Sequence, residues 1–390
     1  MQRRSFLRSG SAALTSLSPL AAWAADDAAK PGFAAAPLLA PIRARAERIV
    51  DISVCTRPFR PRGPRLEAER RHGKTIVHHY GHGGSGWSLS WGSAQAVLPL
   101  VLATREPRIA VVGCGVIGLT TARVAQRAGL RVRIVAKDRP PEVRSSAATG
   151  VWSPDSRICT EANATPEFQQ RWVTMARASF KVWQSLLGLA GDPVEWRDGY
   201  VLSDVPFDQP VEPPPNAPAG EFEEPDYPDL VDLARDIYPR SEPLTPGQHP
   251  FRVPHARRYT QMVFNLPAYS RLLLDDFLRE GGEIEHREFT HPREFASLKE
   301  RTIVNCTGYG ARALFGDDSL VPVRGQTARL MPQPEVNYGV HWRGHNLHVV
   351  PRRDGILVQA QGPHDYGNAD ATPDRAATEA AVARLAELFA

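Results

Sequence analysis

Sulfur-containing residues, long apolar runs and excess charge are all scarce in this chain of 390 residues. It holds four cysteines and four methionines, and its formal net charge is only +4. Removal of an N-terminal segment with three arginines would bring that charge close to neutral and leave no basic stripe for nucleic acid. No stretch of about 18 apolar residues follows that segment, so no stable membrane span is predicted. We find no internal repeat and predict no metal site.

The four cysteines, at positions 55, 114, 159 and 306, could form disulfides in an oxidising compartment. Cys114 lies inside a glycine-rich turn, however, and Cys306 follows the apolar run Thr302-Ile-Val-Asn305. Both positions suit small buried side chains better than cross-links. We therefore expect mostly free thiols.

The first 24 residues have the pattern of an export signal. A twin-arginine motif, Arg3-Arg4-Ser-Phe-Leu-Arg8, precedes an apolar run of small residues, and Ala22-Trp-Ala24 provides a cleavage site. The sequence therefore predicts export of a folded protein to the periplasm by the twin-arginine route, with residues 25–46 as a linker. An ordinary secretory signal and a basic disordered tail are the alternatives.

The remaining chain has the composition of a globular protein, with 42% apolar and 23% charged residues. Its length suits one large domain or two coupled domains. A proline-rich stretch, residues 206–258, is expected to form an irregular surface excursion. Periodicity predicts helices over 87–104, 117–128, 166–187, 266–280 and 373–389, two of them capped by Thr165 and Thr372. It predicts strands over 47–54, 75–78, 108–112, 131–136, 283–289, 302–306, 324–331, 346–350 and 356–359.

The most informative motif is Ile109-Ala-Val-Val-Gly-Cys-Gly-Val-Ile-Gly-Leu-Thr120. An apolar run leads into Gly113, Gly115 and Gly118 and then into a helical pattern, as in the phosphate-binding turn of a dinucleotide fold. Asp138 follows the second strand, twenty residues after Gly118, where an acid can bind ribose hydroxyls. This unit predicts a bound dinucleotide, but by itself it leaves FAD and NAD open.

Three other segments favour a flavin. Ser145–Pro154 supplies small residues whose bare backbone can lie along a flat ring, and Val304-Asn-Cys-Thr-Gly308 is a strand that ends in a small-residue turn. His79–Gly86 is a glycine-rich loop directly before a helix. The start of that helix would place positive potential beside the ring, which favours an anionic reduced flavin.

With these segments the chain resembles the D-amino-acid oxidase family of FAD enzymes over roughly residues 47–390. The family places its Arg-Pro-x-Arg-Pro and Tyr-Gly-His-Gly-Gly segments last, whereas here they precede the first glycine turn. The chain is therefore similar to a circular permutation, with new ends after the helix at 373–389 and before the strand at 47–54. The further matching pieces are Arg57–Pro61, Arg65-Leu-Glu67, Trp87–Trp91, Ala136–Pro140, Arg324-Gly-Gln326 and Val349–Arg352.

The resemblance implies an FAD-dependent oxidase of D-amino acids or related amines. Hydride would pass from the substrate Cα to flavin N5, and the products would be a 2-oxo acid, ammonia and hydrogen peroxide formed from oxygen. Two other readings stay open: a dehydrogenase of amines or amino acids that uses a quinone or another acceptor, and a non-catalytic flavoprotein. The sequence also leaves a homodimer open.

Arg57 matches the family's substrate-carboxylate arginine, whose planar guanidinium can hold a carboxylate through two parallel bonds. The alternative is a structural salt bridge in a proline-rich turn. Gly84 would offer backbone groups to the substrate. His348 stands where the family has a tyrosine that helps bind the carboxylate, and its hydrogen bond would depend on pH; a structural histidine is the alternative. The family's second, lid tyrosine has no clear match, and the candidates are Tyr338, His341 and His345.

The expected cofactor-binding residues come from five segments of the sequence. They are Gly83, Gly84, Ser85, Gly86, Trp87, Ser88, Gly113, Gly115, Val116, Ile117, Gly118, Lys137, Asp138, Ser145, Ser146, Gly150, Trp152, Thr307 and Gly308.

The predicted fold class is α/β: a Rossmann-like FAD-binding domain with a parallel sheet, plus a substrate domain with a mixed or antiparallel sheet, in circularly permuted order. We assign residues 57–155 and 265–324 to the FAD-binding domain. The substrate domain would comprise residues 47–56, 156–264 and 325–390.

Overall fold

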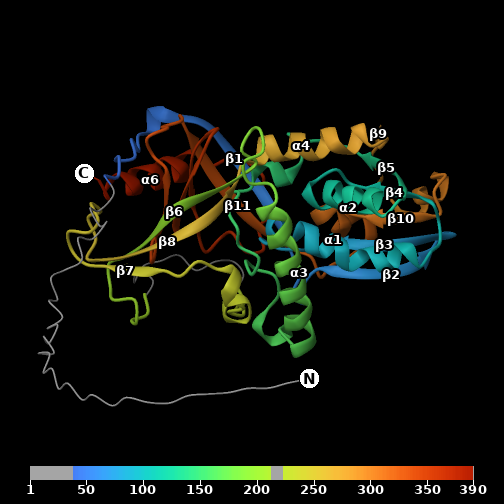
Figure 1. Ribbon diagram of the computed structural model, residues 1–390, viewed down its shortest axis with the longest axis horizontal. Coiled ribbons are helices and arrows are strands. Elements are labelled where there is room, and N and C mark those ends of the chain that lie inside the picture. The colour runs from blue at the N-terminus through green and yellow to red at the C-terminus, as the bar shows by residue number, and fades with distance from the viewer. Residues whose placement is uncertain (1–37, 212–222, 390) are drawn as a thin grey trace, which may run out of the picture. The chain divides into compact units, whose positions relative to one another are not determined.

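The computed structural model describes residues 38–211 and 223–389. The predicted twin-arginine signal and the prolines at 213–215 lie outside the described residues. From Leu39 onward the chain forms one compact unit, which contains two β-sheets (Figure 1).

The first sheet has six strands and is parallel except at one edge. Its spatial order is β2, β3, β10, β4, β5, β9, and β2 pairs antiparallel to β3. The bounds are β2 (Arg65–Arg71), β3 (Lys74–Tyr80), β10 (Thr302–Asn305), β4 (Arg108–Val112), β5 (Arg131–Ala136) and β9 (Glu283–His286). Parallel sheets are covered on both faces, so their central strands are apolar on both sides.

Strand β4 shows how both faces of this sheet are covered. Ile109 and Val111 belong to a core that includes residues of α1 (Gly86–Leu102), α2 (Val116–Arg127), α3 (Pro166–Gln184) and α4 (Leu266–Arg279). Ala110 and Val112 point the other way and pack with Phe295 and Leu314, from η5 (Pro292–Ser297) and α5 (Ala311–Phe315). The short helices elsewhere are η1 (Ala46–Arg48), η2 (Arg144–Ala147), η3 (Glu161–Asn163), η4 (Val231–Ile237) and η6 (Gly308–Gly310).

The second sheet has eight strands in the order β1, β11, β14, β13, β12, β6, β8, β7. One of its faces is apolar and packs with α6 (Arg375–Ala386) and with Ile42 in a separate core. The opposite face carries polar residues and is called here the site face. The bounds are β1 (Ile49–Phe59), β11 (Val321–Leu330), β14 (Gly355–Ala360), β13 (Leu347–Arg352), β12 (Tyr338–Trp342), β6 (Val194–Ser203), β8 (His255–Phe264) and β7 (Glu242–Leu244).

The predicted α/β fold class is confirmed, and so are all five predicted helices. Thr165 caps α3 as expected, since its side chain accepts a hydrogen bond from the Phe168 amide. The expected cap of the last helix is wrong. Asp374 caps α6 by accepting from the Ala377 amide at 2.9 Å, so this helix begins two residues later than predicted. The four cysteines are buried free thiols, again as expected.

The proline-rich stretch is more regular than predicted. Its described part contains η4, β7 and the first residues of β8. β7 and β8 pair antiparallel, and β8 continues along β6, so the stretch extends an edge of the eight-stranded sheet. The division of residues 47–390 into two domains stays a prediction, because the contacts hold the chain from Leu39 onward as one unit.

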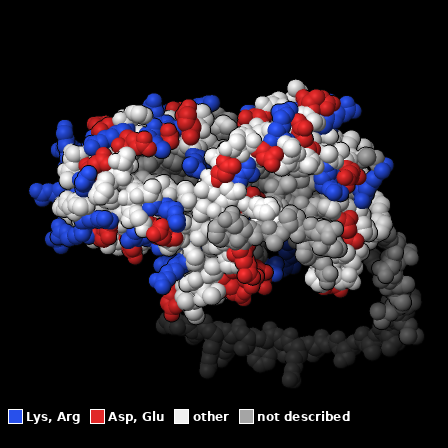
Figure 2. All heavy atoms as spheres, turned by 180° about the vertical axis from the view of Figure 1, so that it is seen from behind, with Lys and Arg blue, Asp and Glu red and all other residues white. Residues whose placement is uncertain are grey.

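Lysine and arginine side chains are interspersed with acidic ones on the face shown in Figure 2. No helix among the described residues is long and apolar enough to span a bilayer.

Candidate functional site

The carboxyl ends of β3, β10, β4 and β5 meet at one edge of the six-stranded sheet, because these strands are parallel and adjacent. The backbone ties the segments that follow them together. The Cys306 amide donates to the Val112 carbonyl at 2.8 Å, and the Gly113 amide donates to the Val135 carbonyl at 3.0 Å. Ligands of open α/β sheets bind at this edge, outside the carboxyl ends of the strands.

The glycine turn after β4 is close-packed on one side and open on the other. A Cβ at Gly113 would overlap the Cys306 carbonyl, and one at Gly118 would overlap the Gly113 carbonyl. At Gly115 a Cβ would meet only the Ser145 hydroxyl, at 3.4 Å. Gly115 is also the N-cap of α2 and has no side chain with which to cap the helix. The start of α2 therefore offers amides and positive potential to an anionic group.

Ser145 joins the starts of two helices that are far apart in the chain. Its hydroxyl accepts from the Val116 amide at 3.2 Å, at the beginning of α2. Its carbonyl accepts from the Trp87 indole at 2.9 Å, at the beginning of α1. The glycine-rich loop before α1 is thus held next to the phosphate-binding turn.

That loop is also packed against two other segments. The Gly83 amide donates to the Pro58 carbonyl, and the Gly84 amide donates to the Ser156 carbonyl at 3.0 Å. A Cβ at Gly83 would overlap the Arg157 carbonyl, so only glycine fits there. The loop therefore connects the glycine turn with the end of β1 that carries Arg57.

The other expected cofactor residues lie around this edge, in different environments. Lys137 and Asp138 are exposed directly after β5, and Lys137 forms an ion pair with Glu288 at 3.0 Å. The Thr307 hydroxyl donates to the Asn305 side chain at 2.8 Å. Trp152 is buried and its ring contacts Phe180, so its side chain belongs to the core. Ser146 and Gly150 flank the segment that crosses to the second sheet, and Ser85, Gly86, Ser88, Ile117 and Gly308 lie within the loops and helix starts described above.

An apolar platform lies on the site face of the eight-stranded sheet. Val263, Val350 and Leu357 form a small buried cluster, and Val151 packs on it. Val151 also bridges to Val263 through the backbone, and the Arg352 guanidinium donates to the Ala148 carbonyl at 3.0 Å. The predicted flavin segment 145–154 is therefore fixed over this platform.

Next to the apolar platform, the site face carries polar side chains. His348 pairs with Gln359 across β13 and β14, and His341 pairs with His348 across β12 and β13. Thr327 shares the face because Arg329 pairs with Leu357 and alternate residues point the same way. We call Thr327, Gln359, His348 and His341 the polar belt. The two imidazole rings are stacked, with centroids 4.1 Å apart.

Arg57 lies beyond the belt, with its guanidinium over Gly325. A Cβ at Gly325 would come within 2.6 Å of the Arg57 guanidinium nitrogens, so glycine makes room for the arginine. One nitrogen donates to the Arg324 carbonyl at 2.8 Å. Arg57 forms no ion pair with a carboxylate of the described chain, whereas Arg157 pairs with Glu224 at 2.7 Å.

Burial keeps the belt histidines neutral. It lowers the pKa of His348 to about 3, and His341, Arg57 and Arg157 add to the effect. Burial lowers the pKa of His341 to about 4, with a contribution from Arg343. The pH-dependent charge that the sequence suggested for His348 is therefore absent near neutral pH, where each ring carries one donor and one acceptor nitrogen.

The sequence analysis did not identify Gln359 or Thr327, nor Tyr259 and its neighbour Gln261. A Cβ at Gly199 would come within 2.6 Å of the Tyr259 ring, and a Cβ at Gly339, the residue paired with Gly199, would overlap the side-chain amide of Gln261. Burial raises the pKa of Tyr259 to about 12. The two glycines are the sequence signal that could have pointed to this position.

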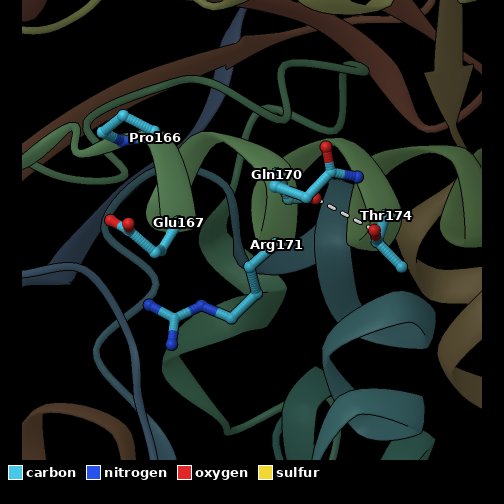
Figure 3. A pocket seen from close by; sticks show the side chains of 5 residues that line it. All are labelled: Pro166, Glu167, Gln170, Arg171 and Thr174. Carbon is cyan, nitrogen blue, oxygen red and sulfur yellow. Dashed lines mark hydrogen bonds between the residues drawn. The ribbon is translucent and has the colours of Figure 1, made fainter.

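A depression at the start of α3 lies outside this arrangement. It is lined by Pro166, Glu167, Gln170, Arg171 and Thr174, all from the first turns of that helix (Figure 3). The Thr174 hydroxyl donates to the Gln170 carbonyl at 2.9 Å. None of the predicted site residues lines it.

The residues at the sheet edge fit a flavin dinucleotide. The open side of Gly115 and the amides at the start of α2 suit a pyrophosphate. Segment 145–154 over the apolar platform suits a flat ring. The imidazole Nε2 of His82, a buried residue of the glycine-rich loop, has no hydrogen-bond partner among the described residues.

Comparison with known proteins also indicates FAD as the cofactor. The family model DAO, described as FAD dependent oxidoreductase, matches residues 108–390. A D-amino-acid oxidase of Rubrobacter xylanophilus is 31% identical over 283 residues, which cover 72% of this chain and 77% of that protein. A D-amino-acid oxidase of Streptomyces coelicolor is 29% identical over 73% of this chain and 78% of its own length. One of Dictyostelium discoideum is 24% identical over 71% of each chain.

The buried histidines predict how stability depends on pH. Burial lowers the pKa of His78 to about 4 and that of His82 to about 3, as it does for His341 and His348. The unfolded chain then binds more protons than the folded one below about pH 6.5. The free energy of unfolding should be level above that pH and fall as the pH drops from 6.5 towards 5. Each histidine contributes at most ~1.4 kcal/mol per pH unit.

Urea unfolding followed by circular dichroism between pH 5 and 8, with excess cofactor, would measure this slope. His348→Asn should flatten it, because one of the titrating groups is removed. A stability that stays level or rises on acidification would contradict the assignment.

Proposed function

The chain belongs to the DAO family of FAD-dependent oxidoreductases, and from this we propose that it is an oxidase of D-amino acids. The substrate, oxygen and water would give a 2-oxo acid, ammonia and hydrogen peroxide. Bound FAD supplies the redox chemistry, because it accepts a hydride and passes two electrons to oxygen. The protein must then bind the substrate carboxylate and hold Cα near the flavin ring.

The observation that carries the proposal is the position of Arg57. Its guanidinium lies over Gly325, within electrostatic reach of His348, and no carboxylate of the described chain pairs with it. A partly buried guanidinium of this kind is suited to a bidentate pair with a ligand carboxylate. The polar belt separates it from the apolar platform under segment 145–154. A bound amino acid could thus reach from Arg57 to the flavin.

The neutral belt also bears on proton handling. With the pKa of both histidines lowered by burial, the rings can accept or donate a hydrogen bond without adding charge beside the amine. A substrate that arrives as a neutral amine needs no dedicated base. We assign orientation of the substrate to Arg57 and His348, and backbone contacts with substrate and flavin to Gly84.

Replacing Arg57 tests the reaction and the carboxylate assignment together. Arg57→Ala should raise KM for D-amino acids at least about thirtyfold, because loss of one partner of a buried charge pair costs 2 kcal/mol or more. Peroxide release from a D-amino-acid panel measures this effect. Arg43→Ala is the matched control, since Arg43 forms an exposed ion pair with Glu335 on the other side of the sheet from the belt, and its KM should stay within twofold of the parent value.

The panel also separates this proposal from its rivals. Dye reduction without oxygen consumption would identify a dehydrogenase in place of an oxidase. A yellow protein whose flavin no D-amino acid bleaches would refute the proposed reaction.

We also propose that the chain is circularly permuted relative to its family. The family match starts at Arg108, the first residue of β4, yet residues 49–102 provide three strands and α1 of the same unit. Ile42 and Leu388 share one buried cluster, so the two ends of the described chain lie close together (Figure 1). Nearby ends are the condition for joining them and opening the chain elsewhere.

A rearranged chain tests this proposal. It would begin at Glu106, continue to Ala390, and pass through a short Gly/Ser linker to residues 39–105. We expect the same flavin absorbance and a kcat/KM within threefold of the parent, because every strand pairing is preserved. The control carries the same linker as an insertion after Asp204. A soluble rearranged chain that fails to bind FAD would show that the present order is required.

Export by the twin-arginine route to the periplasm is a separate proposal that rests on residues 1–24. In a host with that pathway, the mature protein should be recovered from the periplasm with FAD bound. Arg3→Lys together with Arg4→Lys should retain it in the cytoplasm as a precursor. Unchanged export of the double variant would exclude the route, and Arg8→Lys is the matched control.

A further inference from the structure

Two atoms of the polar belt are buried and lack partners. Residue Gln359 is 4% exposed and residue Thr327 is 2% exposed. Neither the amide nitrogen of Gln359 nor the hydroxyl of Thr327 has a hydrogen-bond partner among the described residues. A buried polar atom without a partner destabilises a fold, so such atoms in a binding site indicate groups that a ligand satisfies.

The neighbouring glutamine Gln326 shows the ordinary arrangement for comparison. It is also buried. It directly precedes Thr327 in β11 and points to the opposite face of the sheet. Its amide nitrogen donates to the Asp374 carbonyl at 2.6 Å and to the Thr378 hydroxyl at 2.7 Å, and its oxygen accepts from the Asp374 amide. Gln326 thus holds α6 in place, whereas the Gln359 amide nitrogen contacts no such group.

The charged residues near the belt indicate which group of a substrate each part of the site can bind. Arg57 forms no ion pair among the described residues, and Arg157 is neutralised by Glu224. Arg343, near His341, also forms none, but its guanidinium donates to the Gln209 carbonyl at 3.1 Å and lies over the Phe207 ring. Asp365 lies near both Arg57 and Arg157. Burial raises the pKa of its carboxyl group, and the positive charges of these two arginines partly oppose that shift. The belt itself is neutral. Arg57 can therefore take the α-carboxylate. A second anionic group would have to draw Arg343 away from the Gln209 carbonyl and the Phe207 ring, and it would meet Asp365 near Arg57.

We propose that the polar belt recognises a neutral amide on the substrate side chain, so that the enzyme prefers D-amino acids of the asparagine type. This inference rests on the proposed function. The Gln359 amide nitrogen and the Thr327 hydroxyl donate to the amide oxygen of the side chain. The neutral imidazoles of His341 and His348 provide acceptor nitrogens for its NH₂ group.

The selectivity follows from what each competing side chain leaves unpaired. An aliphatic side chain of the same shape cannot pair the buried donors, and sites built to hydrogen-bond a substrate group strongly reject analogues that lack it. A carboxylate pairs with the donors, but it has no hydrogen to offer to the imidazole acceptors. D-asparagine, D-leucine and D-aspartate have nearly the same shape and isolate these differences.

The experiment compares these three substrates with the holoenzyme. We expect kcat/KM for D-asparagine to exceed that for D-leucine and for D-aspartate at least about tenfold. The deaminated analogues succinamate, 4-methylpentanoate and succinate cannot be oxidised, and they test recognition without turnover. Their dissociation constants, from perturbation of the flavin spectrum, should follow the same order.

Two glutamine variants form a matched pair. Gln359→Leu should reduce the preference for D-asparagine over D-leucine at least fivefold, while the midpoint of thermal unfolding without ligand stays equal or rises. Gln326→Leu should lower that midpoint and leave the preference unchanged, because its amide is fully bonded within the fold. Opposite movements of stability and selectivity distinguish a ligand-binding role for Gln359 from a structural one.

Several outcomes would overturn the inference. A preference for D-leucine or D-aspartate would refute it, and so would a Gln359→Leu variant that loses stability but keeps its selectivity. If no D-amino acid bleaches the flavin while succinamate still binds best, the proposed reaction fails and the recognition of an amide stands.

Discussion

Parallel pairing of β10 with both β3 and β4 is the constraint on which the rest of the structure depends. It brings the carboxyl ends of three strands to one edge, although they come from widely separated parts of the sequence. The turn after β4 and the loop after β3 then lie close enough for Ser145 to bond the starts of both following helices. Because adjacency in the sheet determines the site, the order of the segments along the chain matters little to its geometry.

Much of this edge could be predicted from the sequence, because each feature there has a local cause. An apolar run, three spaced glycines and a helical pattern specify a strand, a tight turn and a helix start without knowledge of distant residues. The overlaps that a Cβ would cause at Gly113 and Gly118 show why only glycine serves there. The cap of α6 could not be chosen in this way. Thr372 and Asp374 both suit the position, and bonds from Gln326 decide between them.

The substrate side of the site was harder to predict, for a different physical reason. The belt exists only through the register of neighbouring strands, which places Gln359 beside His348 and His348 beside His341. In its own strand Gln359 stands at the end of an apolar run and resembles the last residue of a buried strand. β6 and β8 were missed for another reason. Asp198 in β6 and Arg258 and Thr260 in β8 lie on the face opposite the site, which is otherwise apolar, and these polar residues interrupt the alternation that marks a half-buried strand.

The pairing of β3 with β10 also has a consequence for synthesis. β3 ends at Tyr80 and β10 begins at Thr302, so the ribosome makes more than two hundred residues between two neighbouring strands. Until β10 has been made, the inner edge of the β2–β3 hairpin has no partner strand. Unpaired strand edges of this kind promote aggregation of nascent chains. The cofactor site can therefore be complete only after β10 has been synthesised, so FAD binding must follow most of chain synthesis.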